Sequence, residues 1–122
     1  MYSIRCVLIF LAVAGAFSFS FGQEDKKQAA LDYIAIAEEM KSASMAFDDI
    51  RGIYEQAAAA DPDNIKANFE AGHYRLMTVG RDLAVPYFLR VYELDANYRF
   101  DLEYWIGLSY QYGLEFDKAI DF

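Results

Sequence analysis

The sequence has only one cysteine and one histidine among its 122 residues. Cys6 lies in an N-terminal apolar stretch, so the rest of the chain has no thiol with which to form a disulfide. His73 stands alone, which excludes a metal site built from several histidines of this chain. The sequence also lacks a Gly-rich phosphate loop, a G-x-S-x-G motif and a C-x-x-C pair. We therefore predict that the chain is not an enzyme, and we expect no cofactor and no bound metal.

Basic residues are few: 11 Lys and Arg stand against 19 Asp and Glu, for a net charge of −8. A nucleic-acid partner requires Lys and Arg to meet the phosphate backbone, so this balance argues against nucleic acid. It argues equally against an anionic lipid surface. No motif predicts a small-molecule substrate either.

The first 22 residues are the least polar part of the chain. They contain one early positive charge, Arg5, then an apolar run, then small residues that end at Gly22. This pattern is typical of a cleaved signal peptide and predicts a mature chain that begins at Gln23. The alternative is an uncleaved membrane anchor, although the run is shorter than the roughly 20 residues of a spanning helix. Cleavage removes Arg5 and Cys6 and leaves a net charge of −9.

Strand signals are missing as well. There is no sustained alternation of period two, and no Asn-Gly or Asp-Gly hairpin turn. Apolar residues recur instead at spacings of three and four, as in Ile50, Ile53, Tyr54 and Ala57. The chain is therefore predicted to be all-α, with six helices near residues 24–41, 45–60, 64–79, 83–94, 99–112 and 115 to the end.

The breaks between these helices contain capping and helix-ending residues. Ser44 is expected to cap the second helix, and Asp63 or Asn64 the third, because short polar side chains accept hydrogen bonds from a helix's first N–H groups. Gly80 and Gly113 are expected at helix ends.

Small residues recur at a matched interval. Gly72 is followed twelve residues later by Ala84, and thirty-five residues further on Gly107 is followed twelve residues later by Ala119. Two antiparallel helices approach closely only where a side chain is nearly absent. We therefore predict that each glycine marks a helix crossing, that each alanine faces it, and that Phe88, like Tyr54, fills space between successive helix pairs.

This pattern resembles the tetratricopeptide repeat, a helix–turn–helix unit that stacks into a solenoid. The resemblance implies an α-solenoid of about three units, near residues 30–63, 64–98 and 99–122, the last incomplete, in a domain that spans residues 23–122. The alternative is a plain helical bundle with coincidental glycines. The residues that carry the resemblance, and are predicted to pack the repeats, are Tyr54, Ala57, Pro62, Gly72, Ala84, Phe88, Val91, Gly107, Tyr110 and Ala119.

The resemblance further implies an inner groove lined by the first helix of each unit. A groove of aromatic, aliphatic and hydrogen-bonding groups suits an extended peptide or a partner's helix. The alternative is that the same side chains pack against a following domain. The candidate groove residues are Lys66, Phe69, His73, Leu76, Met77, Asp101, Tyr104, Leu108, Gln111 and Tyr112.

Taken together, the signal peptide and the segments 83–98 and 100–122 resemble the N-terminal region of OmpA-family cell-envelope proteins of Bacteroidetes-type bacteria. In that family the repeats precede a β-propeller-like segment and a peptidoglycan-binding domain. The resemblance implies a non-catalytic scaffold, in the periplasm or at the outer membrane of a Gram-negative bacterium. Because the last helix is cut short, we expect the chain to be the N-terminal part of a longer protein. The alternatives are a repeat arm of an enzyme whose catalytic domain lies beyond residue 122, and an exported chaperone-like peptide binder.

Overall fold

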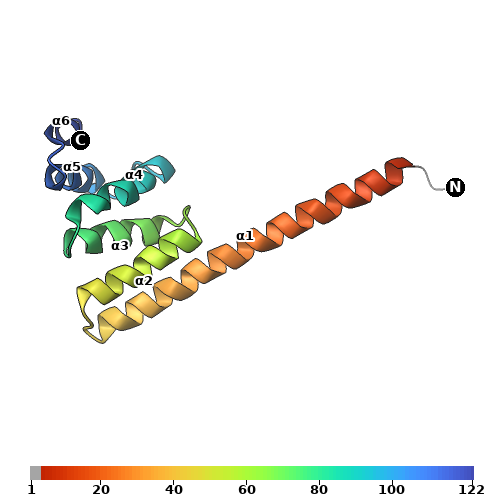
Figure 1. Cartoon of the computed structure of the whole chain (residues 1–122), viewed down its shortest axis with the longest axis horizontal. Coiled ribbons are helices and arrows are strands. Elements are labelled where there is room, and N and C mark those ends of the chain that lie inside the picture. Colours follow the sequence, from red (N-terminus) through yellow and green to blue (C-terminus); the bar gives the residue numbers. More distant parts are fainter. Residues whose placement is uncertain (1–3) are drawn as a thin grey trace.

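The computed structural model describes the backbone of residues 4–122 and the side chains from residue 22 onward. Every regular element within this range is helical, which confirms the all-α prediction. Figure 1 shows that the helices follow one another in a stacked progression. The elements are α1 (Ile4–Ser42), α2 (Phe47–Ala60), α3 (Ile65–Leu76), the 3-10 helix η1 (Arg81–Ala84), α4 (Val85–Leu94), α5 (Leu102–Tyr112) and α6 (Phe116–Ile120).

The first helix is much longer than predicted. α1 has 39 residues, and its N-terminal half extends away from the other helices (Figure 1). The predicted signal peptide covers residues 1–22. Its first three residues lie outside the described residues, and the rest belongs to the part of α1 whose side chains are not described. Its cleavage stays a prediction. In the part of the chain that the structure describes, no helix combines the length and apolar character needed to cross a membrane.

Two cap predictions have different outcomes. The prediction for Asn64 is confirmed, because its side-chain oxygen accepts a hydrogen bond from the backbone N–H of Ala67 at 2.9 Å. The prediction for Ser44 is wrong: α2 begins after Ala46, which makes no side-chain cap bond. Ser44 instead has φ 55° and closes the end of α1, where its N–H donates to the carbonyl of Lys41 at 3.0 Å.

The prediction that Gly113 lies at a helix end is confirmed, and the end of α5 has the same turn geometry as the end of α1. Gly113 is the C-cap but has φ −84°, whereas Leu114 has φ 61°. The N–H of Leu114 donates to Gln111 at 3.0 Å, and that of Glu115 to Tyr110 at 2.9 Å, which is the bond pattern of a Schellman motif. The left-handed position that favours glycine therefore holds a leucine.

The break after α3 also differs from its prediction. α3 ends at Leu76 rather than at 79, and Gly80, with φ 67°, precedes η1. Asp82 lies in the first turn of η1. Consequently the predicted helix 83–94 is divided into the short 3-10 turn and α4.

Two turns thirty-four residues apart are built alike. Asp61 after α2 and Asp95 after α4 are both extended C-cap residues. The Asp61 carboxylate accepts the N–H of Asp63 at 3.1 Å, and the Asp95 carboxylate accepts the N–H of Asn97 at 2.9 Å. The chain therefore reverses direction by the same local hydrogen bonding after α2 and after α4.

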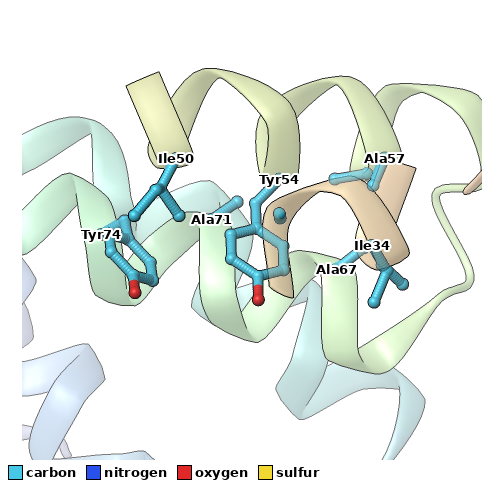
Figure 2. Close-up of a cluster of buried hydrophobic side chains, with 9 residues drawn as sticks. Ile34, Ile50, Tyr54, Ala57, Ala67, Ala71 and Tyr74 are labelled. Atoms are coloured by element: carbon cyan, nitrogen blue, oxygen red, sulfur yellow. The ribbon is translucent and has the colours of Figure 1, made fainter. Parts of the chain in front are cut away.

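A first core cluster lies between α1, α2 and α3 (Figure 2). Tyr54 on α2 is completely buried, and its ring stacks on Tyr74 of α3 with centroids 5.6 Å apart. Alanines on the facing helices leave room for these rings. The buried members are Ile34, Ala37, Ile50, Tyr54, Ala57, Ala58, Ala67, Ala71 and Tyr74.

A second core cluster lies between α3, α4 and α5. Phe88 of α4 is its completely buried aromatic ring, and Phe69 packs on it with centroids 5.6 Å apart. Because α3 contributes to both clusters, the core is divided between successive helices rather than gathered at one centre. The buried members are Phe69, Leu76, Ala84, Phe88, Val91, Leu102, Ile106 and Tyr110.

The two repeated glycines have different neighbours. A Cβ at Gly107 would lie 3.2 Å from the backbone carbonyl oxygen of Ala119, so α6 approaches α5 where the spacing predicted. At Gly72 the prediction is corrected: the nearest atoms, at 3.0 Å, belong to the Phe88 ring and not to Ala84. Phe88 therefore fills the space left by Gly72 within its own helix pair, in addition to contributing to the contact with α5.

Candidate functional site

Alternate helices share one polar and aromatic face. Lys66 on α3 pairs with Glu38 on α1, with Nζ and Oε1 3.0 Å apart. His73 on α3 meets Trp105 on α5, with ring centroids 5.3 Å apart. We call Glu38, Lys66, His73, Asp101 and Trp105 the α1–α3–α5 face. Its side chains come from three helices that are not consecutive in the chain, so the face exists only because the helices stack.

Glu38 joins three helices at one end of this face. Its carboxylate accepts a hydrogen bond from the Tyr54 hydroxyl at 2.7 Å and also faces Lys66 and Lys41. The hydrogen bond from Tyr54, followed by that from Lys66, lowers the pKa of Glu38 from 4.5 to about 2. Burial, together with the bond to Glu38, raises the pKa of the Tyr54 hydroxyl above its ordinary value. Glu38 is therefore a fixed negative charge at neutral pH.

At the other end of the face, Asp101 forms hydrogen bonds with two neighbouring side chains. It accepts the Nε proton of Arg99 at 2.8 Å and the indole N–H of Trp105 at 2.9 Å. The hydrogen bond from Arg99 holds the pKa of Asp101 below its usual value. The Arg99 guanidinium also lies 4.8 Å from the centroid of the Phe69 ring. The indole is thus held in one orientation beside His73.

His73 sits between the two ends and is half-buried. Its ring also stacks on Phe69, with centroids 6.0 Å apart. Burial lowers the pKa of His73 below its ordinary value, so the ring is neutral at pH 7. Among the residues whose side chains are described, no group of three or more His, Cys, Asp and Glu side chains is arranged to hold a metal ion. The face presents fixed charges and aromatic rings.

The structure separates the candidate groove residues into two environments. Phe69 and Leu76 are only 4% and 7% exposed, because both belong to the second core cluster. The prediction that they line an open groove is wrong for these two residues. Lys66 is exposed on α3, Met77 is exposed at the C-cap of α3, and His73 on α3 is half-buried.

The candidates on α5 lie mostly away from the α1–α3–α5 face. Tyr104, Leu108 and Gln111 line a hollow of about 350 Å³ between α5 and α6. Tyr112 is exposed, and its ring and hydroxyl meet Arg81, whose Nη1 lies 3.2 Å from the hydroxyl oxygen. Asp101 and Tyr104 both contact Trp105, which meets His73 of α3; the ring centroids of Tyr104 and Trp105 lie 5.2 Å apart.

The predicted repeat-packing residues lie inside the molecule, apart from those of the turns and the last helix. Pro62 is exposed in the turn between α2 and α3, where its carbonyl accepts a hydrogen bond from Asn68 at 3.0 Å. Ala119 is half-buried against Gly107. The buried ones are Tyr54, Ala57, Gly72, Ala84, Phe88, Val91, Gly107 and Tyr110.

Sequence reasoning did not single out Glu38, Arg99 or Trp105 as members of the site. A helical spacing of four between Asp101 and Trp105 was the available signal for their hydrogen bond. No local signal points to Glu38, because its partners Tyr54 and Lys66 lie on other helices.

Comparisons of the chain with protein-family models, with curated proteins and with solved structures find no match.

Proposed function

We propose that the chain is a tetratricopeptide-like α-solenoid that acts as a non-catalytic scaffold and holds a partner protein or peptide on its α1–α3–α5 face. The proposed setting is the bacterial cell envelope, reached through the predicted signal peptide. There the chain serves as the N-terminal part of a larger OmpA-family protein associated with peptidoglycan and the outer membrane.

The α1–α3–α5 face is the observation that carries this proposal. Glu38 and Asp101 are held by hydrogen bonds from neighbouring helices and residues, and Trp105 is fixed beside His73. A partner therefore meets charges and rings that already have their orientation, which reduces the entropy lost on binding. Opposite charges at intervals along the face, including exposed Lys66, suit an extended peptide of mixed charge.

Site-specific photo-crosslinking in the producing bacterium tests this function. A photoreactive phenylalanine analogue placed at Lys66 lies on the face, whereas the same group at exposed Gln56 on α2 serves as the matched control. We expect one or two discrete crosslinked products from position 66 and none of the same mass from position 56.

Two outcomes contradict the proposal. Identical products from both positions would show that the face has no special role in capture. A broad smear of products from position 66 would favour the chaperone-like peptide binder over a scaffold with a defined partner.

A further inference from the structure

Gln23, the first residue of the predicted mature chain, lies on an exposed part of α1. Every residue from Gly22 to Gln28 is exposed, and the first buried residue among the described side chains of α1 is Ala30. A Cβ placed at Gly22 would have no atom within 4 Å. Cleavage after Gly22 would therefore leave Gln23 at a solvent-exposed helix end, about two turns before the packed part of α1.

The charges that follow Gln23 are those of a helix start. Glu24 and Asp25 come directly after it, whereas the first turn of α1 as it stands, from Ile4, has no acidic residue. Carboxylates are favourable in the first turn of a helix, because the unpaired backbone N–H groups there carry partial positive charge. A helix that begins at Gln23 therefore has the stabilising charges that the longer helix lacks at its own start.

A chain that begins with glutamine can close its first residue into a ring. The free α-amine attacks the side-chain Cδ, so that an N–Cδ bond forms and the Cδ–Nε2 bond breaks. The amide nitrogen leaves as ammonia and takes the proton that the amine gives up. The product is pyroglutamate, a five-membered lactam, and no oxidant or other reactant is consumed. Because the amine and the amide belong to one residue, no second molecule has to be brought into position.

The surroundings of Gln23 favour loss of the terminal charge. An N-terminal ammonium here would lie at the positive end of the α1 dipole, where a cation is unfavourable. Gln23 also lines a hollow of about 300 Å³ between α1 and the turn after α2, together with Lys26 and Lys27. The acids of that turn already have partners, because Asp61 accepts the N–H of Asp63 and Asp63 pairs with an arginine of α4. Cyclisation therefore removes a positive charge from a site where cations already gather.

We propose that Gln23 is converted to an N-terminal pyroglutamate once the predicted signal peptide has been removed. The modification rests on the export proposed above, and not on the scaffold role of the α1–α3–α5 face. The modified end is neutral and offers no free amine to an aminopeptidase. It therefore protects the exposed start of α1 from being trimmed toward Ala30.

Mass spectrometry of the full chain, purified from the bacterium that produces it, tests the modification. Chymotryptic cleavage after Tyr33 releases the N-terminal peptide, and fragmentation assigns any loss of ammonia to one residue. We expect this peptide to begin at Gln23 and to lack one ammonia, and Gln23→Ala to abolish the loss. Gln28→Ala is the matched control and should keep it, because Gln28 lies in the same peptide but its backbone nitrogen is already part of a peptide bond.

The outcomes separate this modification from the export on which it rests. A peptide that begins at Gln23 and keeps its ammonia overturns the modification but leaves export standing. The same holds for a mature chain that begins at a residue other than Gln23, and for an ammonia loss that persists in Gln23→Ala. A chain that retains residues 1–22 overturns both the modification and the proposed removal of the signal peptide.

Discussion

At the residue scale, Glu38 shows how one carboxylate can tie three helices together. It accepts the Tyr54 hydroxyl from α2 and pairs with Lys66 from α3. Its pKa, lowered to about 2, means that folding favours its charged form. The resulting stabilisation is fully present above its ordinary pKa of 4.5 and is lost as the pH falls toward 2.

We expect Glu38→Gln to lower the free energy of unfolding at pH 7 by about 1 kcal/mol, because the amide keeps an acceptor for Tyr54 but loses the charge. The difference between the variant and the parent should shrink as the pH falls from 4.5 toward 2. Urea denaturation followed at several pH values measures it. Glu39→Gln, at an exposed neighbouring position, is the control. A difference that stays constant with pH would contradict the role assigned to Glu38.

Also at the residue scale, only some side-chain roles could be predicted from sequence. The cap made by Asn64 depends on residues three apart, so local chemistry was sufficient to find it. Phe69 and Leu76 were predicted to line a groove because of their place in the repeat. Their burial depends on α4 and α5, which local sequence does not describe.

At the element scale, the end of α5 places a leucine where glycine is favoured. A left-handed conformation costs a non-glycine residue about 1–2 kcal/mol. Leu114 has φ 61° and is 75% exposed, so it gains little from packing in return. Gly113, one position earlier, has an ordinary φ of −84°.

We therefore expect Leu114→Gly to raise the free energy of unfolding by about 1 kcal/mol. Gly113→Ala is the matched comparison: its new Cβ would lie 3.5 Å from the nearest atom, the Cβ of Asp82, which is ordinary contact. This second change should leave stability equal or slightly raised. Thermal unfolding of both variants measures the effects, and destabilisation by Leu114→Gly would contradict the assigned conformation.

At the scale of the whole molecule, the two core clusters predict that a mutation in one cluster will destabilise the helices around it more than the helices around the other cluster. Among the helices whose side chains are described, α3 is the only one that contributes buried residues to both clusters. In a stacked array each unit depends mainly on its neighbours, so damage in one cluster should remain partly local. In a protein with a single shared core, the same mutation would instead destabilise all helices to a similar extent.

We expect Ile106→Ala, in the second cluster, to lower stability by about 2–5 kcal/mol, because it leaves a cavity at a completely buried position. Hydrogen exchange should then rise more in α4, α5 and α6 than in α2. Ile50→Ala, in the first cluster, is the matched change and should show the reverse distribution. Equal loss of protection throughout both variants would favour a bundle over a stack.

Sequence by itself determined the helical class and most helix positions, because periodicity, capping residues and proline act within a few neighbouring residues. It also determined the approach of α6 at Gly107, where the smallness of one residue is enough. Only the tertiary structure decided that Phe88 fills the space at Gly72, that Phe69 is covered while Tyr104 is open, and that Glu38 meets Tyr54 and Lys66. Those outcomes depend on which helix lies against which, and side-chain burial follows from that contact rather than from local pattern.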